Sequence, residues 1–424
     1  MAIALLLFII LLLLRVPIAF VLGITTVIYI FASSNLGLVA TVPQRLYSGL
    51  ETYSLLAIPL FMMAGELMNS GGITSRLISF AKTLVGHFRG GLAYVNVIAN
   101  MLLASIIGSA TAQIAMMSRV MVPSMEKEGY PREFSSATTA SAGLLGPIIP
   151  PSMMFIIYGV GSGASIGSMF LAGVVPGLIL GFLFAILIGY FGWKQKWPTS
   201  KKATIVEMGI SFLKVLPALL VPVIIIAGIL SGAFTPTESA AIACIVALIV
   251  GFFFYKELKL KDLPGVMINT TISTATITML IAMANLFGWM LSFEKIPHAI
   301  ATWMTSLSDN PLVFLLIVNI VLLFIGMFMD GIAALIILVP IFTPIIANYG
   351  IDPVHFGVII CINLTIGLLT PPVGTGLYIA SSLGNVRLET LSKAILPFLA
   401  VSFVALAIIT YWPAVVLWLP AFLN

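Results

Sequence analysis

Residues 143–152, GLLGPIIPPS, and residues 367–374, GLLTPPVG, are the two stretches that decide the fold. Each interrupts a long apolar sequence with a pair of adjacent prolines. Proline has no backbone N–H, its ring clashes with the preceding helical turn, and it disfavours helical geometry at the residue before it. An apolar helix must therefore unwind at both places.

The two stretches belong to an internal repeat. Five pairs of residues are separated by the same 221 positions: Pro123 and Pro344, Gly129 and Gly350, Gly146 and Gly367, Pro150 and Pro371, and Pro151 and Pro372. A constant offset between such landmarks indicates an internal duplication. We interpret residues 105–152 and 326–373 as equivalent stretches, each of which contributes an interrupted hairpin and a broken helix to one shared centre.

The composition places the chain in a membrane. Of its 424 residues, 61% are hydrophobic and only 8% are charged, which leaves too few polar groups to cover a soluble protein. The long apolar runs must be helices, because lipid offers no hydrogen-bond partners and the alternation of a β-barrel is absent. We expect spans at residues 16–33, 167–193, 211–231, 236–255, 312–328 and 394–418. The predicted fold is an all-α polytopic membrane protein with two inverted repeats.

Basic residues predict the orientation of the chain. Lysines cluster on two loops with two spans between them: Lys194, Lys196, Lys201 and Lys202, and then Lys256, Lys259 and Lys261. Both loops therefore lie on one side, and the positive-inside rule makes that side cytoplasmic. Residues 73–91 alternate apolar and basic positions, which predicts an amphipathic helix along the same surface. The net charge of +5 needs no nucleic acid to explain it.

Several residues favour structural interpretations. The apolar start, Met1 to Leu14, lacks a basic n-region and a cleavage site, so we expect a retained span rather than a signal peptide. Cys244 and Cys361 fall within apolar spans, which predicts buried thiols rather than a disulfide. His298 and His355 are single loop histidines, and we expect no metal at either.

Each half also contains a turn inside apolar sequence, upstream of its proline break. In the first half the small residues Gly108 to Ala112 separate two apolar segments, and in the second half Gly326, Asp330 and Gly331 take the corresponding positions. Segments of about 12 to 15 residues are too short to span, so we expect re-entrant hairpins whose tips reach the midplane. An ordinary helix with a small-residue packing face is the alternative.

The repeated breaks have a chemistry of their own. Unwound backbone turns carbonyl groups inward, and together with Ser and Thr hydroxyls they form the all-oxygen surroundings that a hard cation such as sodium prefers. The 221 offset pairs Ser109 with Asp330 and Ile149 with Thr370. A proton would need a titrating group in each half, and the first half has none at its centre, so sodium is favoured there. No organic cofactor is indicated.

Four charged residues leave alternatives open. Asp330 is the only acid deep within the paired stretches, which favours a functional role, although it could also cap a helix. Glu66 could be a coupling carboxylate or an interfacial helix end, and Glu238 fits a helix N-terminus. Arg119 could contact a solute or snorkel to the membrane surface. An anionic solute would otherwise be held by half-helix N-termini, hydroxyls and bound cations.

Short motifs along nearly the whole chain resemble the large membrane subunit of tripartite ATP-independent periplasmic (TRAP) transporters. They are Pro59-Leu60-Phe61, Ala64-Gly65, Gly90-Gly91-Leu92, Gly108-Ser109-Ala110, Gly129-Tyr130, Pro150-Pro151-Ser152, Ala172-Gly173, Pro176-Gly177, Thr235-Pro236-Thr237-Glu238 and Thr370-Pro371-Pro372-Val373-Gly374. The resemblance implies an elevator-type secondary transporter of the bacterial inner membrane. It would import an organic acid with two or more sodium ions, using a periplasmic binding protein and a small four-helix subunit, which we expect to be a separate polypeptide.

The resemblance also implies a division of the chain and its site residues. Residues 1–91, 166–310 and 386–424 would form the scaffold, its connecting arm and the last span, and residues 92–165 and 311–385 the mobile transport domain. One sodium would sit among Ser105, Ser109, Gly146, Ile149 and Pro151, which we name the first cage. The other would sit among Gly326, Gly367, Thr370 and Val373, the second cage. Ser109, Ser152 and Asp330 would line the substrate cavity.

The substrate class and the mechanism have alternatives. The family that the chain resembles handles four-carbon dicarboxylates, sialic acid and other acids, and the chain looks most like the sialic-acid branch. A channel would need a continuous polar pore. An intramembrane aspartyl protease would need a second acid facing Asp330. A divalent-anion/sodium symporter that works without a binding protein shares the hairpins and is the closest alternative.

Overall fold

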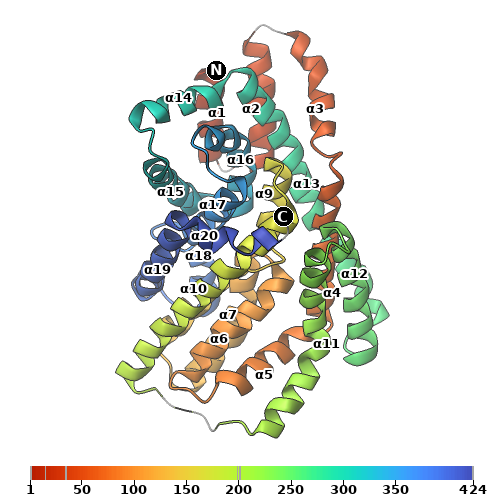
Figure 1. The fold of residues 1–424 in the computed structure, drawn as a ribbon, viewed down its shortest axis with the longest axis vertical. Helices are drawn as coiled ribbons and strands as arrows, with labels where there is room; N and C mark the ends of the chain where they lie inside the picture. The colour runs from red at the N-terminus through yellow and green to blue at the C-terminus, as the bar shows by residue number, and fades with distance from the viewer. Residues whose placement is uncertain (1, 15, 34–35, 198, 200–201, 423–424) are drawn as a thin grey trace.

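A computed structural model describes residues 2–14, 16–33, 36–197, 199 and 202–422 of the chain (Figure 1). Within these ranges all regular structure is helical. Seven helices are long and apolar enough to cross a membrane, or eight if a bent pair counts as one span. The predicted all-α polytopic fold is confirmed. Of the residues used in the predictions, Met1 and Lys201 lie outside the described ranges.

The helices follow one another as in this list: α1 Ala2–Leu13, α2 Ile18–Ala32, η1 Leu36–Thr41, α3 Val42–Ser48, η2 Tyr53–Leu56, α4 Ala57–Ser70, α5 Ile73–Val85, α6 Gly91–Ile107, α7 Ala110–Lys127, α8 Arg132–Gly143, α9 Met153–Ser162, α10 Ile166–Gln195, α11 Ile205–Leu230, α12 Pro236–Ile249, η3 Val250–Phe254, η4 Leu260–Asp262, α13 Leu263–Phe293, α14 Ile296–Leu307, α15 Pro311–Phe328, α16 Gly331–Asn348, α17 Pro353–Gly367, α18 Thr375–Gly384, α19 Leu388–Tyr411, α20 Pro413–Leu417 and η5 Pro420–Phe422. The predicted run 16–33 forms only the 15-residue α2. The predicted run 394–418 is interrupted, because Trp412 precedes Pro413 and leaves helical geometry.

The bounds of the following helix pairs match the 221 offset to within two residues. Helices α7 and α16 each have 18 residues, and they begin at Ala110 and Gly331. Helices α9 and α18 each have 10 residues, and they begin at Met153 and Thr375. The amphipathic helices α5 and α14 also correspond, and Figure 1 shows them at opposite ends of the molecule. This placement agrees with halves of opposite orientation.

Two residues alone connect α6 to α7 and α15 to α16, and the arms of these predicted hairpins are longer than expected. The arms α6 and α7 have 17 and 18 residues, and the first tip consists of Gly108 and Ser109 alone. Ser109 is extended and its hydroxyl accepts a hydrogen bond from the Ala112 N–H, so α7 begins at Ala110. Asp330 caps α16 in the same way by accepting from the Ile332 N–H at 3.0 Å. The estimate of 12 to 15 residues was wrong because these caps allow helix to start directly after each turn.

The broken helices connect the two halves. Helix α8 ends at Gly143 and resumes as α9, and α17 ends at Gly367 and resumes as α18. Both breaks contain a cis peptide bond between adjacent prolines. After the break, α9 packs against α16 of the second hairpin, and α18 packs against α7 of the first. Each half thus places its second half-helix on the hairpin of the other half, which makes one central unit.

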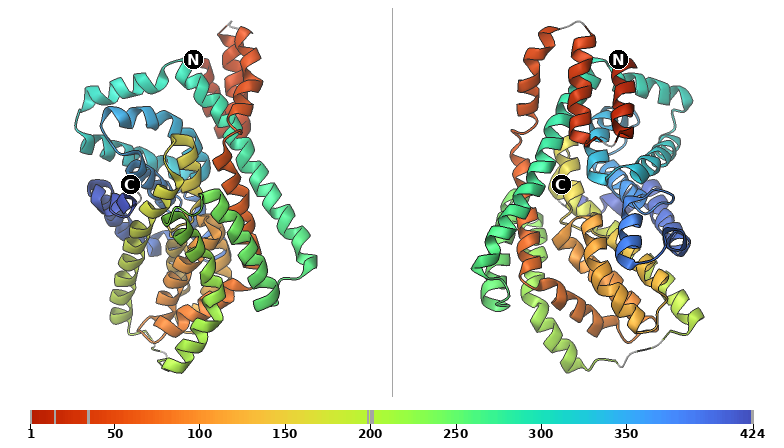
Figure 2. Two further views of the ribbon diagram at one scale, coloured as in Figure 1. Left: turned by 45° about the vertical axis from the view of Figure 1, so that its right-hand side comes forward. Right: turned by 180° about the vertical axis from the view of Figure 1, so that it is seen from behind.

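A frame of long helices flanks this unit. Helices α3 and α4, bent by 53° at their junction, run beside the 31-residue α13 along one side of the molecule (Figure 2). Helix α5 buries Ile73, Leu77 and Ala81 on one face, as an amphipathic helix should, and it packs against α6 and α11.

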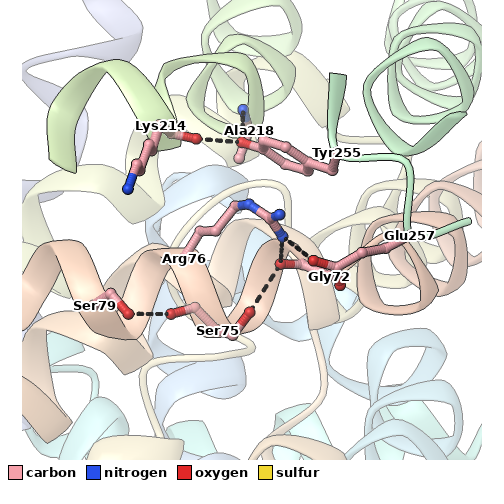
Figure 3. Close-up of polar contacts among 8 residues, drawn as sticks. All are labelled: Gly72, Ser75, Arg76, Ser79, Lys214, Ala218, Tyr255 and Glu257. Carbon is pink, nitrogen blue, oxygen red and sulfur yellow. Dashed lines mark hydrogen bonds and ion pairs between the residues drawn. The ribbon is translucent and has the colours of Figure 1, made fainter. Parts of the chain in front are cut away.

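The start of α5 is fixed by Arg76 (Figure 3). Its Nη1 donates to the Gly72 carbonyl at 2.7 Å and forms an ion pair with Glu257 at 2.7 Å. The guanidinium carbon also lies 3.9 Å from the centroid of the Tyr255 ring. The end of α10 and the start of α13, which border the two basic loops, lie toward this end of the molecule, which we call the lysine-rich end.

Two further predictions concern single residues. Glu238 caps the start of α12 in a reciprocal capping box with Thr235, as predicted for a helix N-terminus. His355 was expected in a loop, and that expectation was wrong. It lies in the first turn of α17, is 3% exposed, and its Nε2 is 2.8 Å from the Ile409 carbonyl oxygen. Its burial follows from packing against α19, which local sequence does not reveal.

Candidate functional site

A cavity of about 340 Å³ lies between the first hairpin and the frame. Its walls come from the tip of that hairpin, the first turn of α9, and helices α4, α11 and α13. Its volume falls within the range of small-molecule sites. Its polar lining consists of Glu66, Asn69, Ser105, Ser109, Ser152, Asn269, Thr270 and Ser273.

Four of the predicted site residues of the first half line this cavity together: Ser105, Ser109, Pro151 and Ser152. The Ser105 hydroxyl donates to the Leu102 carbonyl at 2.8 Å. The other two members of the first cage lie behind them. Gly146 is fully packed against Gln113, and Ile149 against Gly177 of α10. The structure therefore gathers the first-half residues on one side of the centre.

Helix starts converge on the cavity. Ser109 caps the 18-residue α7, and Ser152 caps the 10-residue α9, with its hydroxyl accepting from the Phe155 N–H at 3.4 Å. The Ser152 hydroxyl also donates to the Pro147 carbonyl inside the break. Unpaired N–H groups and the helix dipole make such starts favourable for an anion. Two of them point at one cavity that also has serine hydroxyls.

The second cage is built by backbone packing. A Cβ placed on Gly367 would lie 2.7 Å from the Cα and carbonyl carbon of Gly326, so these two glycines are in direct contact. The Thr370 hydroxyl donates to the Ile366 carbonyl at 3.1 Å, and Val373 lies in the break itself. None of the four residues of the second cage is among the described residues that line the cavity.

Asp330 lies beside the cavity rather than in its lining. Its side chain is accessible, and one carboxylate oxygen accepts the Ile332 N–H. Ile332, two residues further on, does line the cavity. The neighbouring Gly331 contacts the side chain of Met154, which follows the first break. The second hairpin tip thus meets the first broken helix, and a third helix start lies at the centre.

The frame supplies a polar wall that the sequence indicated only weakly. Glu66 of α4 lines the cavity, and among the described residues its carboxylate has no hydrogen-bond or ion-pair partner. Thr270 of α13 is 7% exposed, and its hydroxyl is buried without a partner. Asn269 and Ser273 lie on the same helix. We name Glu66, Asn269, Thr270 and Ser273 the frame wall. In the sequence, only the hydroxyl and amide side chains within apolar helices indicated this wall.

The hairpin tip touches the frame at one glycine. A Cβ placed on Gly65 of α4 would lie 2.4 Å from the carbonyl oxygen of Ile106, in the last turn of α6. Only a glycine allows backbone to approach so closely. Gly65 precedes Glu66, so this contact brings the frame wall to the edge of the cavity.

Buried amides connect each hairpin to its broken helix. In the first half, Asn96 and Asn100 of α6 join Gln113 of α7 to Thr139 of α8 through hydrogen bonds of 2.6 to 2.8 Å. In the second half, Asn319, Asn363 and Thr410 form a similar chain. Sequence reasoning missed both networks, because their members are far apart along the chain.

Two other candidates are excluded from the cavity. Arg119 is exposed on α7 and does not line it. Among the described residues no three His, Cys, Asp or Glu side chains gather in a way that could hold a metal ion. The oxygen groups of the two breaks, by contrast, suit a weakly bound monovalent cation.

The sequence of the chain is similar to known transporter subunits. Residues 5–415 match the family described as "Tripartite ATP-independent periplasmic transporter, DctM component". The C4-dicarboxylate TRAP transporter large permease protein DctM of Pseudomonas aeruginosa is 43% identical over 90% of this chain and 89% of its own length. The sialic acid TRAP transporter large permease protein SiaM of Vibrio cholerae is 39% identical over 95% and 94%.

The fold has known counterparts among solved structures. The YdaH transporter of Alcanivorax borkumensis superposes with a TM-score of 0.65 at 15% identity, over 96% of this chain and 98% of its own. MtrF of Neisseria gonorrhoeae gives a TM-score of 0.63 at 11% identity, over 90% and 85%. At these identities the likeness concerns the arrangement of helices alone.

Proposed function

The chain belongs to the DctM component family of tripartite ATP-independent periplasmic transporters, and from this premise we propose that it imports an organic acid together with sodium ions across the bacterial inner membrane. Its relatives are permeases rather than enzymes. The observation that carries the proposal is the pair of proline-interrupted helices, each packed against a hairpin, at one centre beside a cavity.

Sodium is the cation that the donor set supports. Both breaks release backbone carbonyls in a buried setting, where leaving them without a partner is unfavourable. Gly146, Gly326 and Gly367 are all buried, and each proposed cage also includes a residue with a hydroxyl, Ser105 in the first and Thr370 in the second. Neutral oxygens of this kind bind a hard cation and release it again. We propose one sodium in each cage.

We place the solute site in the cavity beside the first cage. Among the described residues that line the cavity there is no Lys, Arg or His. An anion there would be held by the starts of α7 and α9, by Ser109 and Ser152, and by the positive charge of bound sodium. This arrangement couples the two, because the acid binds well only when the cations are present. Sialic acid or a C4-dicarboxylate is the proposed passenger, on the names of the relatives.

Movement of the central unit past the frame would carry the solute. The cavity stands at the level of residues 61–69 of α4 and 269–277 of α13, the parts nearer the lysine-rich end. With that end cytoplasmic, a cavity at this level supports an inward-facing state, which we propose for this structure. A second, smaller cavity of about 170 Å³ contains Asn285. A tip that moved from Ser273 to Asn285 would travel about 18 Å at 1.5 Å per residue.

Partners follow from the family. A tripartite transporter has a small membrane subunit and a periplasmic binding protein, and we propose both for this chain. Some relatives carry additional sequence: the sialic acid TRAP transporter permease protein SiaT of Haemophilus influenzae aligns over 99% of this chain but 68% of its own length. Because the relatives DctM and SiaM are each named as a large permease protein, we propose that the small subunit of this chain is a separate polypeptide.

Uptake into proteoliposomes tests the proposal. The protein, reconstituted with its small subunit and binding protein, is expected to accumulate labelled acid when sodium is outside. An inward proton gradient without sodium should give no uptake. Proton-driven uptake would remove the sodium assignment. Equal uptake without the binding protein would instead favour a divalent-anion/sodium symporter.

A further inference from the structure

We propose that the side-chain oxygen of Gln113 is a further ligand of the cation in the first cage. The proposal rests on the proposed sodium coupling, and it adds a residue that neither the repeat nor the family resemblance indicates. Gln113 lies in the second turn of α7, one turn beyond the hairpin tip, and is completely buried.

A chain of hydrogen bonds fixes which way the Gln113 amide points. The Thr139 hydroxyl donates its only hydrogen to the Ser135 carbonyl at 2.7 Å, so it must accept from the Asn96 Nδ2 at 2.6 Å. The Asn96 Oδ1 then accepts from the Asn100 Nδ2 at 2.8 Å, and the Asn100 Oδ1 accepts from the Gln113 Nε2 at 2.8 Å. Each amide sets the next. The Gln113 Oε1 therefore points away from α6.

The freed oxygen lies over the first break. A Cβ placed on Gly146 would be 2.4 Å from the Gln113 Oε1, so the oxygen sits against this glycine. Among the described residues no group donates a hydrogen bond to it, although it is buried. A buried acceptor without a partner is unfavourable. Its surroundings therefore call for a donor or a cation.

A cation suits this position better than a protein donor. Gly146 belongs to the first cage, whose other members contribute only neutral oxygens. An amide oxygen has the same hard, neutral character as a backbone carbonyl and is a common ligand of hard cations. The hydrogen bonds to Asn100 hold it in place before the ion arrives, which lowers the cost of ordering it on binding.

The second half repeats the arrangement with different residues. Asn319 Nδ2 donates to the Thr410 hydroxyl at 3.1 Å, and Asn363 Nδ2 donates to the Asn319 Oδ1 at 2.6 Å. The Asn363 Oδ1 is likewise buried and without a partner, four residues before Gly367 of the second cage. Gln113 and Asn363 are not related by the 221 offset, since Ala334 occupies the position equivalent to Gln113. Both halves thus contain a buried amide oxygen that hydrogen bonds of the amide nitrogen orient, and in the first half this oxygen lies against a glycine of the cage.

Sodium titration of the purified protein tests the proposal without a transport assay. The melting temperature in detergent is measured against sodium concentration, with potassium keeping the ionic strength constant. We expect Gln113→Met, which keeps the length of the side chain and lacks the oxygen, to need about tenfold more sodium, the scale seen when a metal site loses a supporting group. Gln113→Asn keeps the amide but withdraws the oxygen by one methylene, and should weaken sodium binding in the same direction.

A control and a positioning variant complete the experiment. Ser118→Ala removes a buried hydroxyl that also lacks a partner, on the same helix as Gln113, and should leave the sodium titration unchanged. Thr139→Val frees the far end of the amide chain and should weaken sodium binding less than Gln113→Met does. Folded Gln113→Met and Gln113→Asn proteins with the wild-type titration would overturn the proposal. A wild-type protein that sodium does not stabilise at all would instead remove the proposed sodium coupling.

Discussion

The two halves of the centre have the same arrangement of helices but differ in charge. Helices α7 and α16 have the same length and the same place in the repeat, yet Ser109 caps the first and Asp330 caps the second. A hydroxyl and a carboxylate do the same structural work at a helix start. Only the carboxylate adds a negative charge at the centre. The repeat therefore supplies the geometry twice, and the chemistry of the two tips is free to differ.

The halves also differ in what they face. The serines of the first half line the cavity beside the frame wall, whereas the second cage is closed by contact between Gly326 and Gly367. One half thus presents its groups to the cavity, and the other holds its break closed by close backbone packing. The following variants test this contrast.

Removing the charge of Asp330 should have the largest effect. Asp330→Asn keeps an oxygen that can cap α16 but loses the carboxylate, so we expect sodium-driven uptake to fall by about 100-fold, the scale of a lost hydrogen bond to a charged group. Asp330→Ala and Ser109→Ala should also abolish uptake. Melting temperature and elution profile check that each variant is folded. Wild-type uptake in Asp330→Asn would reduce Asp330 to a cap.

The glycine of the second cage, Gly367, should tolerate substitution by alanine less well than Gly146 of the first cage. Gly367→Ala would force a Cβ to within 2.7 Å of the Gly326 backbone, and overpacking of this kind costs about 1–3 kcal/mol. Gly146→Ala would meet a side-chain oxygen, Gln113 Oε1, and only the Gly143 carbonyl of the backbone at 3.3 Å, so it would strain the hydrogen bonds of one amide rather than push two backbones apart, and the loss should be smaller. Melting temperatures in detergent without sodium compare them. Gly265→Ala, with nothing within 4 Å, is the control. A larger loss in Gly146→Ala would contradict the contrast.

The contact between the first tip and the frame should control the position of the central unit. Gly65→Ala places a Cβ 2.4 Å from the Ile106 carbonyl oxygen, so the tip must retreat, although alanine favours a helix. If this overlap costs about 1.4 kcal/mol, the equilibrium between the present position of the central unit and its other positions would shift tenfold away from the present one. Labelling of Ser109→Cys from the cytoplasmic side measures this shift, since Cys244 and Cys361 are buried.

Gly209→Ala is the matched control for this experiment, because nothing lies within 4 Å of its Cβ position. In the Ser109→Cys protein, Gly209→Ala should leave the rate of labelling unchanged. Equal labelling in Gly65→Ala and Gly209→Ala would show that the tip does not depend on the frame at this point.

The anchor of α5 should matter least. Its counterpart, α14, has Pro297 at the position equivalent to Arg76, and Pro297 cannot form such an ion pair. The side chains of Arg76 and Glu257 are 26% and 47% exposed, and such pairs contribute under about 1 kcal/mol. Glu257→Gln should lower the melting temperature slightly, less so at high salt, and leave uptake intact. Loss of uptake would make this anchor part of the transport cycle.

Much of the fold could be predicted from the 221 offset. Proline pairs unwind helices wherever they occur, so the breaks after Gly143 and Gly367 were visible from local chemistry. The arm lengths were not, because they depend on the hydrogen bonds that Ser109 and Asp330 make after folding. The end of α19 at Tyr411 could have been read from Pro413.

The site was less predictable than the fold. The breaks and hairpin tips could be located from their glycine, serine and proline residues. The frame wall could not be located in this way, because Glu66 and Thr270 come to line the same cavity only when α4 packs against α13. The orientation of Gln113 depends on Thr139, which belongs to another helix. Contacts across distant segments leave no periodic pattern in a sequence.

A structure determined in sodium and the transported acid tests the central claim most directly. The account predicts cation density at both breaks, one beside Ser105 and Gly146 and the other beside Gly326 and Gly367, with the acid between Ser109 and Asp330. It also predicts that both cation peaks disappear when potassium replaces sodium. Breaks that stay without cations while the acid is bound would contradict the account.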